Sequence, residues 1–349
     1  MKNSNCSFVK LSILVPCYNV SKYIDECLDS IADQITNQCE VIIYDDGSTD
    51  DTAEKIKQHR IVKGLDACLI LAQENGGISV ARNNLLEHAR GQYIWFVDSD
   101  DKILDNAISN VLGCIAQHQP DILFFDYNAW FHDPTPRMIR KGFQRTSFDG
   151  KPGFYQNTDD GLLYNATMKS TRLHPWSKIY RRTLFKNGTE FPVGKIFEDV
   201  TVVPLLSAYA ETAFYLNQPL VAYRAREGSI LSSLRADKEI ESLRAVKEFK
   251  NRYEKNIGAL SKKSHLITTY FAALQLRHII KSIAKHPDKQ ESAFLIEQCL
   301  HEFKSIHGKN TFYALYACLR EGDFFHFIHC SKRLIQAHLI CWFNKQKKA

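Results

Sequence analysis

The stretch Tyr93-Ile-Trp-Phe-Val97, which runs directly into Asp98-Ser-Asp-Asp101, decides the fold class. Five apolar residues with β-forming side chains predict a buried strand, and the polar residues mark its end. Four more apolar runs in the first 126 residues also predict strands; the runs are Leu11–Pro16, Val41–Tyr44, Ala67–Ala72 and Ile122–Phe125.

Helical patterning separates these predicted strands. Apolar residues recur at helical spacing from Ile24 to Ile35, and three further helices are predicted at Ser48–His59, Ile78–Ala89 and Leu104–His118. Because strand and helix alternate, the sequence predicts an α/β fold with a mostly parallel central sheet. Ligands of such sheets bind beyond the carboxyl ends of the strands, so the polar loops after the strands are expected to converge on one site.

The loop at 98–101 carries the acids expected to hold a metal ion. Asp98 and Asp100 are separated by one residue and can face the same ligand. Carboxylates held together repel unless a cation neutralises them, and hard oxygen ligands favour Mg²⁺ or Mn²⁺, which would bridge to a diphosphate. The alternative is a capping and turn cluster. A second acidic loop at Asp45–Ser48 favours ligand binding.

Composition and charge narrow the function classes. The chain has 349 residues, 44% hydrophobic and 24% charged, which predicts a globular protein of one large domain or two closely packed ones. Residues 1–126 contain 10 Lys and Arg against 19 Asp and Glu, whereas residues 127–349 contain 35 against 20. A uniformly basic chain would suggest nucleic acid, but this segregated charge indicates separate tasks and no nucleic-acid partner.

The cysteines and the lack of leader patterns point to the cytoplasm. No two of the ten cysteines are closer than ten positions, which excludes a CxxC zinc or redox motif. Because several lie among apolar residues, we expect reduced core thiols at Cys17, Cys27, Cys68, Cys114 and Cys318. No signal-peptide pattern or membrane-spanning run is present, so the sequence predicts a cytoplasmic protein.

Four motifs, in order, resemble glycosyltransferase family 2, the inverting enzymes with the GT-A fold. The motifs are Leu14-Val-Pro-Cys-Tyr-Asn19, Ile43-Tyr-Asp-Asp-Gly-Ser-Thr-Asp50, Glu74-Asn-Gly-Gly-Ile-Ser-Val-Ala-Arg-Asn83 and Phe96-Val-Asp-Ser-Asp-Asp101. Three later stretches resemble the branch of the family that makes bacterial cell-surface polysaccharides; they are His174–Arg181, Phe197–Asp199 and Tyr223–Ile230.

The resemblance implies a domain plan. A GT-A, Rossmann-like catalytic domain would cover residues 1–235, with a nucleotide-binding half at 1–126 and an acceptor half at 127–235. A helical C-terminal region would follow at 236–349, where helical periodicity returns with Lys, Glu and His faces.

The resemblance also assigns residues to the nucleotide. Pro16, Tyr18 and Asn19 would line the base pocket, Asp45 would accept a hydrogen bond from uracil N3, and Asp46 would support that loop. The alternative for Pro16 and Tyr18 is an ordinary strand end.

For the sugar diphosphate, the resemblance points to the next two motifs. Asn75 and Arg82 would lie near the donor, with the Arg82 guanidinium on base or diphosphate; the alternative for Arg82 is a solvated helix face. Asp98, with Ser99, would contact ribose or metal-bound water, and Asp100 would bind the metal.

Glu198 and Asp199 precede the apolar run Val200–Leu206 and are predicted to begin a helix. A purely structural N-terminal cap is one interpretation. The resemblance implies that an acid here removes the proton of the acceptor hydroxyl, with Asp199 as the first choice and Glu198 as the second. One base suffices in a single displacement with inversion, because a metal-neutralised diphosphate leaves without protonation.

Other polar and aromatic groups have two interpretations each. Arg181, Arg182, Arg224 and Arg226 would bind diphosphate or an anionic acceptor, or else form surface ion pairs. Trp176 would stack on a sugar ring, or else belong to the core.

The stretch Phe324–Ala349 has five Lys and Arg and no Asp or Glu. After Phe324 and Phe325 it has eight large apolar side chains: Phe327, Ile328, Leu334, Ile335, Leu339, Ile340, Trp342 and Phe343. This composition predicts an amphipathic segment in peripheral contact with an anionic membrane. The alternative is a helix docked on the protein.

Together these features predict transfer of a hexose or N-acetylhexosamine from a UDP-sugar to a bacterial surface glycan acceptor, such as lipopolysaccharide or capsule, free or lipid-linked. One alternative is a nucleotidyltransferase that makes nucleotide sugars, but the N-terminus lacks its Gly-rich basic loop. The other is an inactive glycan- or lipid-binding protein, against which intact Asp98, Asp100 and Asp199 argue.

Overall fold

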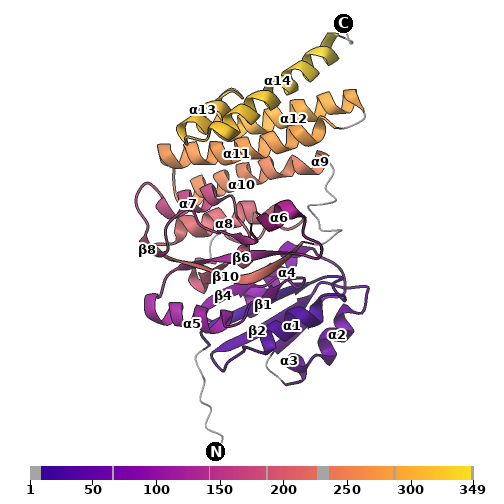
Figure 1. Ribbon diagram of the computed structural model, residues 1–349, viewed down its shortest axis with the longest axis vertical. Coiled ribbons are helices and arrows are strands. Elements are labelled where there is room, and N and C mark those ends of the chain that lie inside the picture. Colours follow the sequence, from indigo (N-terminus) through magenta and orange to yellow (C-terminus); the bar gives the residue numbers. More distant parts are fainter. Residues whose placement is uncertain are drawn as a thin grey trace, which may run out of the picture.

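The computed structural model has an α/β body with a stack of helices above it (Figure 1). It describes residues 9–64, 67–140, 142–185, 188–225, 236–285 and 288–346.

A ten-stranded mixed sheet forms the centre of the body, in the order β3-β2-β1-β4-β9-β6-β10-β5. Its first half is parallel, as predicted, and consists of β1 (Leu11–Cys17), β2 (Cys39–Asp45), β3 (Ala67–Leu71) and β4 (Tyr93–Phe96). Every residue of β1 and β4 is buried, because helices or loops cover both faces of these strands.

The second half of the sheet is mixed. Here β9 (Lys178–Arg181) lies antiparallel between β4 and β6 (Ile122–Phe131), and β6 pairs in parallel with β10 (Thr212–Ala225). Three short strands complete the sheet: β5 (Lys102–Ile103), β7 (Gln144–Arg145) and β8 (Gly153–Gln156). The strand predicted at Ile122–Phe125 continues for six more residues, to Phe131. The prediction stopped short because the polar residues Asp126 and Asn128 interrupt the apolar pattern there.

The body's helices are α1 (Ile24–Ala32), α2 (Thr52–Gln58), α3 (Arg60–Lys63), α4 (Ile78–His88), α5 (Ala107–His118), α6 (Pro136–Arg140), α7 (Leu162–Ser170) and α8 (Glu198–Tyr209), with 3₁₀ turns at Pro175–Ser177 and Arg182–Leu184. The helix predicted from Ser48 begins only at Thr52. Its cause is Asp50, whose carboxylate accepts from the backbone of Ser21 and Thr52 and holds the preceding residues in a loop.

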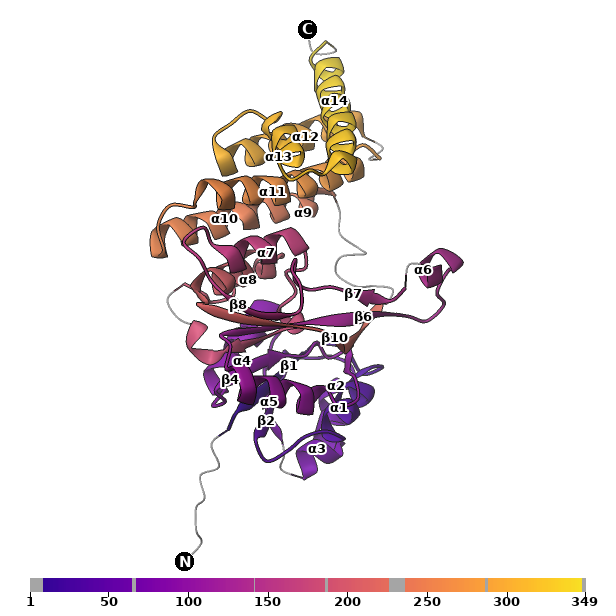
Figure 2. The same cartoon turned by 60° about the vertical axis from the view of Figure 1, so that its left-hand side comes forward.

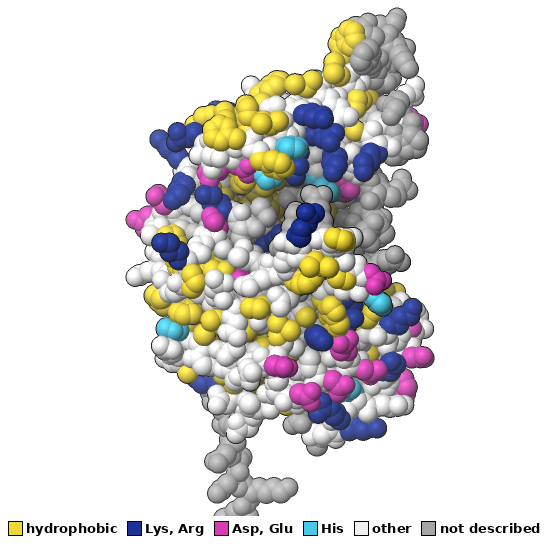
Figure 3. All heavy atoms as spheres, in the orientation of Figure 1, with side chains coloured by type: hydrophobic (Ala, Val, Ile, Leu, Met, Phe, Trp, Pro, Cys, Tyr) yellow, Lys and Arg dark blue, Asp and Glu magenta, His cyan; other side chains and the backbone are white. Residues whose placement is uncertain are grey.

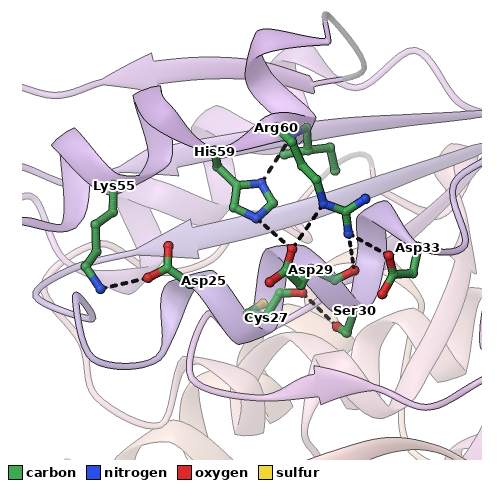
Figure 4. Close-up of polar contacts among 9 residues, drawn as sticks. Asp25, Cys27, Asp29, Ser30, Asp33, Lys55, His59 and Arg60 are labelled. Atoms are coloured by element: carbon green, nitrogen blue, oxygen red, sulfur yellow. Dashed lines mark hydrogen bonds and ion pairs between the residues drawn. The ribbon is translucent and has the colours of Figure 1, made fainter.

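Ion pairs on the surface join α1 to α2 and α3 (Figure 4). Lys55 pairs with Asp25 at 2.7 Å, and Arg60 pairs with Asp29 at 3.2 Å and Asp33 at 2.6 Å. These side chains are largely exposed, so each pair adds only about 0 to 1 kcal/mol of stability.

The helices above the body are α9 (Ala236–Glu239), α10 (Glu241–Asn256), α11 (Lys262–Ile283), α12 (Lys289–His307), α13 (Tyr313–Arg320) and α14 (Phe324–Gln346). In Figure 2 they rise from α7 and α8, and α14 points away from the body. Their core also takes residues from α7 and α8, among them Met168 and Val203, so this packing unit draws on both sides of position 235.

The structure also bears on the predictions about membrane-spanning segments and about the cysteines. No helix in the described part of the chain is long and apolar enough to span a membrane. Cys17, Cys27 and Cys318 are buried thiols, as expected, but Cys68 is exposed because β3 is an edge strand, and Cys114 is only half-buried.

Candidate active site

The loops after β1 and β2 interlock through side-chain hydrogen bonds. Ser48 donates to Asp45 at 2.5 Å and accepts from the Asn19 backbone at 2.9 Å, while the Asn19 side chain accepts from the Thr49 backbone at 2.8 Å. Tyr18 is 45% exposed beside them, whereas Pro16 lies inside β1 and is buried. The structure therefore brings Asn19 and Asp45 together in one pair of loops, next to the exposed ring of Tyr18.

Asp46 ties this loop pair to the start of α4. Its carboxylate accepts from the backbone of Gly76 at 3.0 Å and of Gly77 at 2.7 Å. A Cβ on Gly47 would lie 2.8 Å from the Glu74 carbonyl carbon, so only glycine permits this approach. Asn75 lies exposed on the same loop.

Three acids follow β4: Asp101 is buried, whereas Asp98 and Asp100 are partly exposed. Burial, with the charge of Asp100 adding to it, raises the pKa of Asp98 to about 6. Asp101 is 1% exposed; one carboxylate oxygen accepts from the Arg224 backbone at 2.8 Å, and the other, buried, has no hydrogen-bond partner. Ser99 is also buried. A cluster of this charge favours a cation.

The donor set of this loop fits a divalent ion that also binds the substrate. Within the described ranges, no three His, Cys, Asp or Glu side chains come together to hold a metal by themselves. Two hard carboxylates, Asp98 and Asp100, are enough when substrate phosphates supply the remaining oxygen ligands, as is usual for Mg²⁺.

Arg82 is not on a solvated helix face, which corrects that alternative. It is 4% exposed, and its guanidinium donates to Glu198 at 2.5 Å and to Asp98 at 3.3 Å. The rings of Phe191 and Phe96 lie 5.4 and 5.9 Å from it. One buried cation thus connects the acidic loop after β4 to the acid pair at the start of α8.

The two acids of that pair, Glu198 and Asp199, accept hydrogen bonds from different donors. Glu198 is held in the Arg82 ion pair, whereas one Asp199 carboxylate oxygen accepts from the Val200 backbone at 2.8 Å. Burial, and next the charge of Glu198, raise the pKa of Asp199 to about 7, although Arg82 acts in the opposite direction. A carboxyl with a pKa near 7 can take up a proton at neutral pH.

Lys178 lies close to Asp199 and was not predicted from the sequence. It is fully buried, and its ammonium donates to the carbonyls of Arg172 at 2.7 Å and His174 at 3.0 Å. Burial lowers the pKa of Lys178 to about 7, and Asp199 opposes that shift. The sequence did contain a sign of this buried lysine, because Lys178 is a charged residue inside the strand-like run Trp176–Tyr180.

Trp176 belongs to the core, so the alternative interpretation of this residue is the correct one. It is 3% exposed and stacks on His174 at 4.9 Å and Tyr223 at 5.2 Å. Its backbone carbonyl also accepts from the Trp95 indole at 3.2 Å.

The arginines predicted to bind anions are engaged within the protein. Arg224 lies 3.8 Å from the Trp130 ring centre and donates to the Asp100 carbonyl at 2.8 Å. Arg181 pairs with Asp121 at 2.8 Å, and Arg182 donates to the carbonyl of Gly91 at 2.8 Å. The fourth, Arg226, lies outside the described residues.

Comparison with known proteins gives consistent matches. The family model "Glycosyl transferase family 2" matches residues 12–188. Glycosyltransferase GlyA of Streptococcus pneumoniae is 33% identical over 235 residues, covering 63% of this chain but only 31% of GlyA. The chain therefore spans less than a third of that curated relative.

Solved structures support the same architecture. The crystal structure of residues 1–349 of TarS from Staphylococcus aureus has a TM-score of 0.65 at 21% identity, covering 94% of this chain and 91% of that one. The same part of TarS in complex with UDP-GlcNAc has a TM-score of 0.55 at 22% identity, covering 90% and 92%. At these identities the likeness shows the fold, a GT-A sheet followed by helices.

Proposed function

Because the chain belongs to glycosyl transferase family 2, we propose that it is an inverting transferase that moves a hexose or N-acetylhexosamine from a UDP-sugar to a bacterial surface glycan. The single observation that carries the proposal is the buried Arg82 guanidinium, which bonds Asp98 on one side and Glu198 on the other. It brings the proposed diphosphate end and the proposed base together, although 116 residues separate Arg82 from Glu198.

The donor is proposed to lie across the loops after β1, β2 and β4. Tyr18 would cover the uracil ring, Asn19 would lie beside it, and Asp45 would accept from N3. The TarS complex with UDP-GlcNAc supports a UDP-sugar on this fold. Asn75 lies near the donor in this arrangement, and Ser99 is a buried support of the acidic loop.

Asp98 and Asp100 would hold Mg²⁺ or Mn²⁺ against the diphosphate, and that ion would supply the positive charge that stabilises the leaving UDP. Arg82 keeps the Asp98 carboxylate turned toward the site. Arg224 fixes the backbone of the same loop at the Asp100 carbonyl.

Asp199 is proposed as the base. Its carboxylate takes the proton of the acceptor hydroxyl as that oxygen attacks the anomeric carbon, and the bond from that carbon to the diphosphate oxygen breaks with its electron pair leaving on UDP. Attack opposite the leaving group inverts the anomeric centre. Glu198 is the weaker candidate, because its carboxylate is already occupied by the hydrogen bond from the Arg82 guanidinium.

The acceptor is proposed to be a glycan of the lipopolysaccharide or capsule type, free or lipid-linked, used at the cytoplasmic face of the membrane. Support comes from the α13–α14 apolar face, which Figure 3 shows over these helices. Its exposed members are Phe312, Tyr316, Leu319, Phe324, Phe325, Ile328, Ile335, Leu339 and Trp342.

This surface refines the amphipathic segment predicted from the sequence. Leu334 is buried in the helical core, and Phe327 and Ile340 pack against that core, so one side of α14 is docked on the protein. Of the remaining predicted apolar side chains, that of Phe343 lies outside the described residues. The exposed side of α14, in a stretch without Asp or Glu, is suited to an anionic lipid surface.

A donor panel tests the proposed function. Purified protein is incubated with Mn²⁺, a truncated lipid-linked glycan as acceptor, and UDP-glucose, UDP-galactose, UDP-GlcNAc or UDP-GalNAc. Released UDP is measured, with Asp199→Asn as the control. We expect release from one or two donors, lost in the control. Pyrophosphate exchange with UTP and a sugar 1-phosphate, without UDP release from any donor, would instead indicate a nucleotidyltransferase.

A further inference from the structure

Asn83, next to Arg82 on α4, makes a two-point contact with a distant backbone. Its side-chain amide donates to the Phe191 carbonyl at 2.9 Å, and its side-chain oxygen accepts from the Phe191 backbone N–H at 2.9 Å. The two bonds satisfy both backbone groups of one residue, much as a neighbouring strand would. They fix both the position and the direction of the chain at Phe191.

Phe191 is firmly anchored seven residues before Glu198. Its side chain is 1% exposed, with its ring 5.6 Å from that of Phe96 and 5.4 Å from the Arg82 guanidinium. The three residues at 193–195 are exposed and include a turn at Gly194, after which α8 begins with Glu198. The anchor at Phe191 therefore sets where this short segment starts.

The N-terminal end of α4 is fixed to the proposed uracil loop. Asp46 accepts from the backbone of Gly76 and Gly77, and α4 begins one residue later. Arg82 and Asn83 lie four and five residues after Ile78, about 6 to 8 Å along the helix axis. The helix therefore joins the proposed uracil loop at its N-terminal end to the segment from Phe191 to Asp199, the acid segment, at its middle.

We infer that Asn83 is a positioning residue: its contact with Phe191 holds the segment before α8 so that Asp199 faces the donor bound at the N-terminal end of α4. The inference rests on the proposed role of Asp199. Arg82 holds Glu198 directly from the same helix turn, so consecutive residues of α4 fix the acid segment at two points.

The neighbouring residue provides a matched control. Asn84 lies on the same helix, and its side-chain amide donates only to the Val80 carbonyl within α4, at 2.9 Å. Asn84→Ala therefore makes the same chemical change one position away without touching the acid segment.

The test compares Asn83→Ala and Asn83→Asp with Asn84→Ala in the full chain. Asp retains an acceptor for the Phe191 N–H but cannot donate to its carbonyl, so it gives a milder variant. Three quantities are measured: amide exchange of peptides covering 191–200, UDP affinity by calorimetry with Mn²⁺, and UDP release from UDP-GlcNAc and the other donors.

For Asn83→Ala we expect amide exchange at Phe191 and Val200 at least tenfold faster, UDP affinity within twofold of wild type, and UDP release slower by on the order of 10²-fold, as for a base displaced by about 1 Å. Asn83→Asp should lie between, and Asn84→Ala should match wild type. Unchanged exchange at Val200, or normal turnover in both Asn83 variants, would overturn the inference. If the wild type releases UDP from no donor, the proposed function fails, while the exchange data still decide whether Asn83 fixes Asp199.

Discussion

Replacing Asp199 by Asn should stabilise the folded protein at pH 8 while it removes turnover. A raised folded-state pKa means that the folded protein holds the proton more tightly than the unfolded chain does. The stability contributed by protonated Asp199 is complete below pH 4 and is lost as the pH rises through about 7. Asn copies the neutral acid at every pH, and its side-chain oxygen still accepts from Val200.

The size of the effect follows from the pKa shift. A rise from 3.8 to about 7 corresponds to about 4 kcal/mol at pH 8 as an upper limit. Because Asp199 interacts with Glu198 and its surroundings relax, we expect about 2 kcal/mol of stabilisation. At pH 4 the difference should be close to zero, since Asp199 is then neutral in the folded wild type.

Glu198→Gln is the matched control, and it should have the opposite effect. Removing Glu198 leaves the buried Arg82 with only its longer contact to Asp98, and breaking a buried ion pair costs about 3 to 5 kcal/mol. Urea unfolding at pH 4 and pH 8 measures both variants. A loss of stability in Asp199→Asn at pH 8, or an equal change at both pH values, would refute the assignment of a neutralisable buried acid at 199.

Two further predictions concern the metal and the membrane. Asp100→Ala should abolish the increase in UDP affinity that Mn²⁺ produces, because Asp98 alone holds the ion poorly against its hydration; calorimetry with and without Mn²⁺ measures this, and an unchanged increase would exclude Asp100 as a ligand. Ile335→Asp should weaken sedimentation with anionic vesicles, whereas Ile139→Asp, at a similarly exposed position on α6, should not. Raised salt should weaken vesicle binding only in part, because burial of apolar side chains is not screened. If the full-length protein does not bind anionic vesicles at low salt, the proposed membrane contact is wrong.

The parallel half of the sheet was predictable because local sequence determines it. Each of the strands from Leu11 to Phe96 is a short apolar run, and the polar loop after it marks the edge where ligands bind. The second half was harder, since β9 joins the sheet between β4 and β6 only through contacts far apart in sequence. No local pattern at Lys178–Arg181 specifies an antiparallel strand in that place.

The candidate site was predictable in its residue types but not in its connections. Asp98, Glu198 and Asp199 stood out because acids follow a strand or begin a helix. The burial of Arg82 and its contacts with two acids depend on how α4 packs against α8, which one sequence does not reveal. Asn83 ends the third motif, but the sequence assigned it no role, because a polar residue on an amphipathic helix is expected to face solvent.

The most direct test of the central claim, inverting transfer from a UDP-sugar, is the anomeric form of the first product. Proton NMR is recorded during turnover of UDP-GlcNAc, or of whichever donor the panel identifies, with water or a glycan as acceptor. Because the sugar of these donors is α-linked, the proposed mechanism predicts that the β-anomer forms first, together with UDP, and that Asp199→Asn forms neither. First formation of the α-anomer would contradict single displacement with Asp199 as the base.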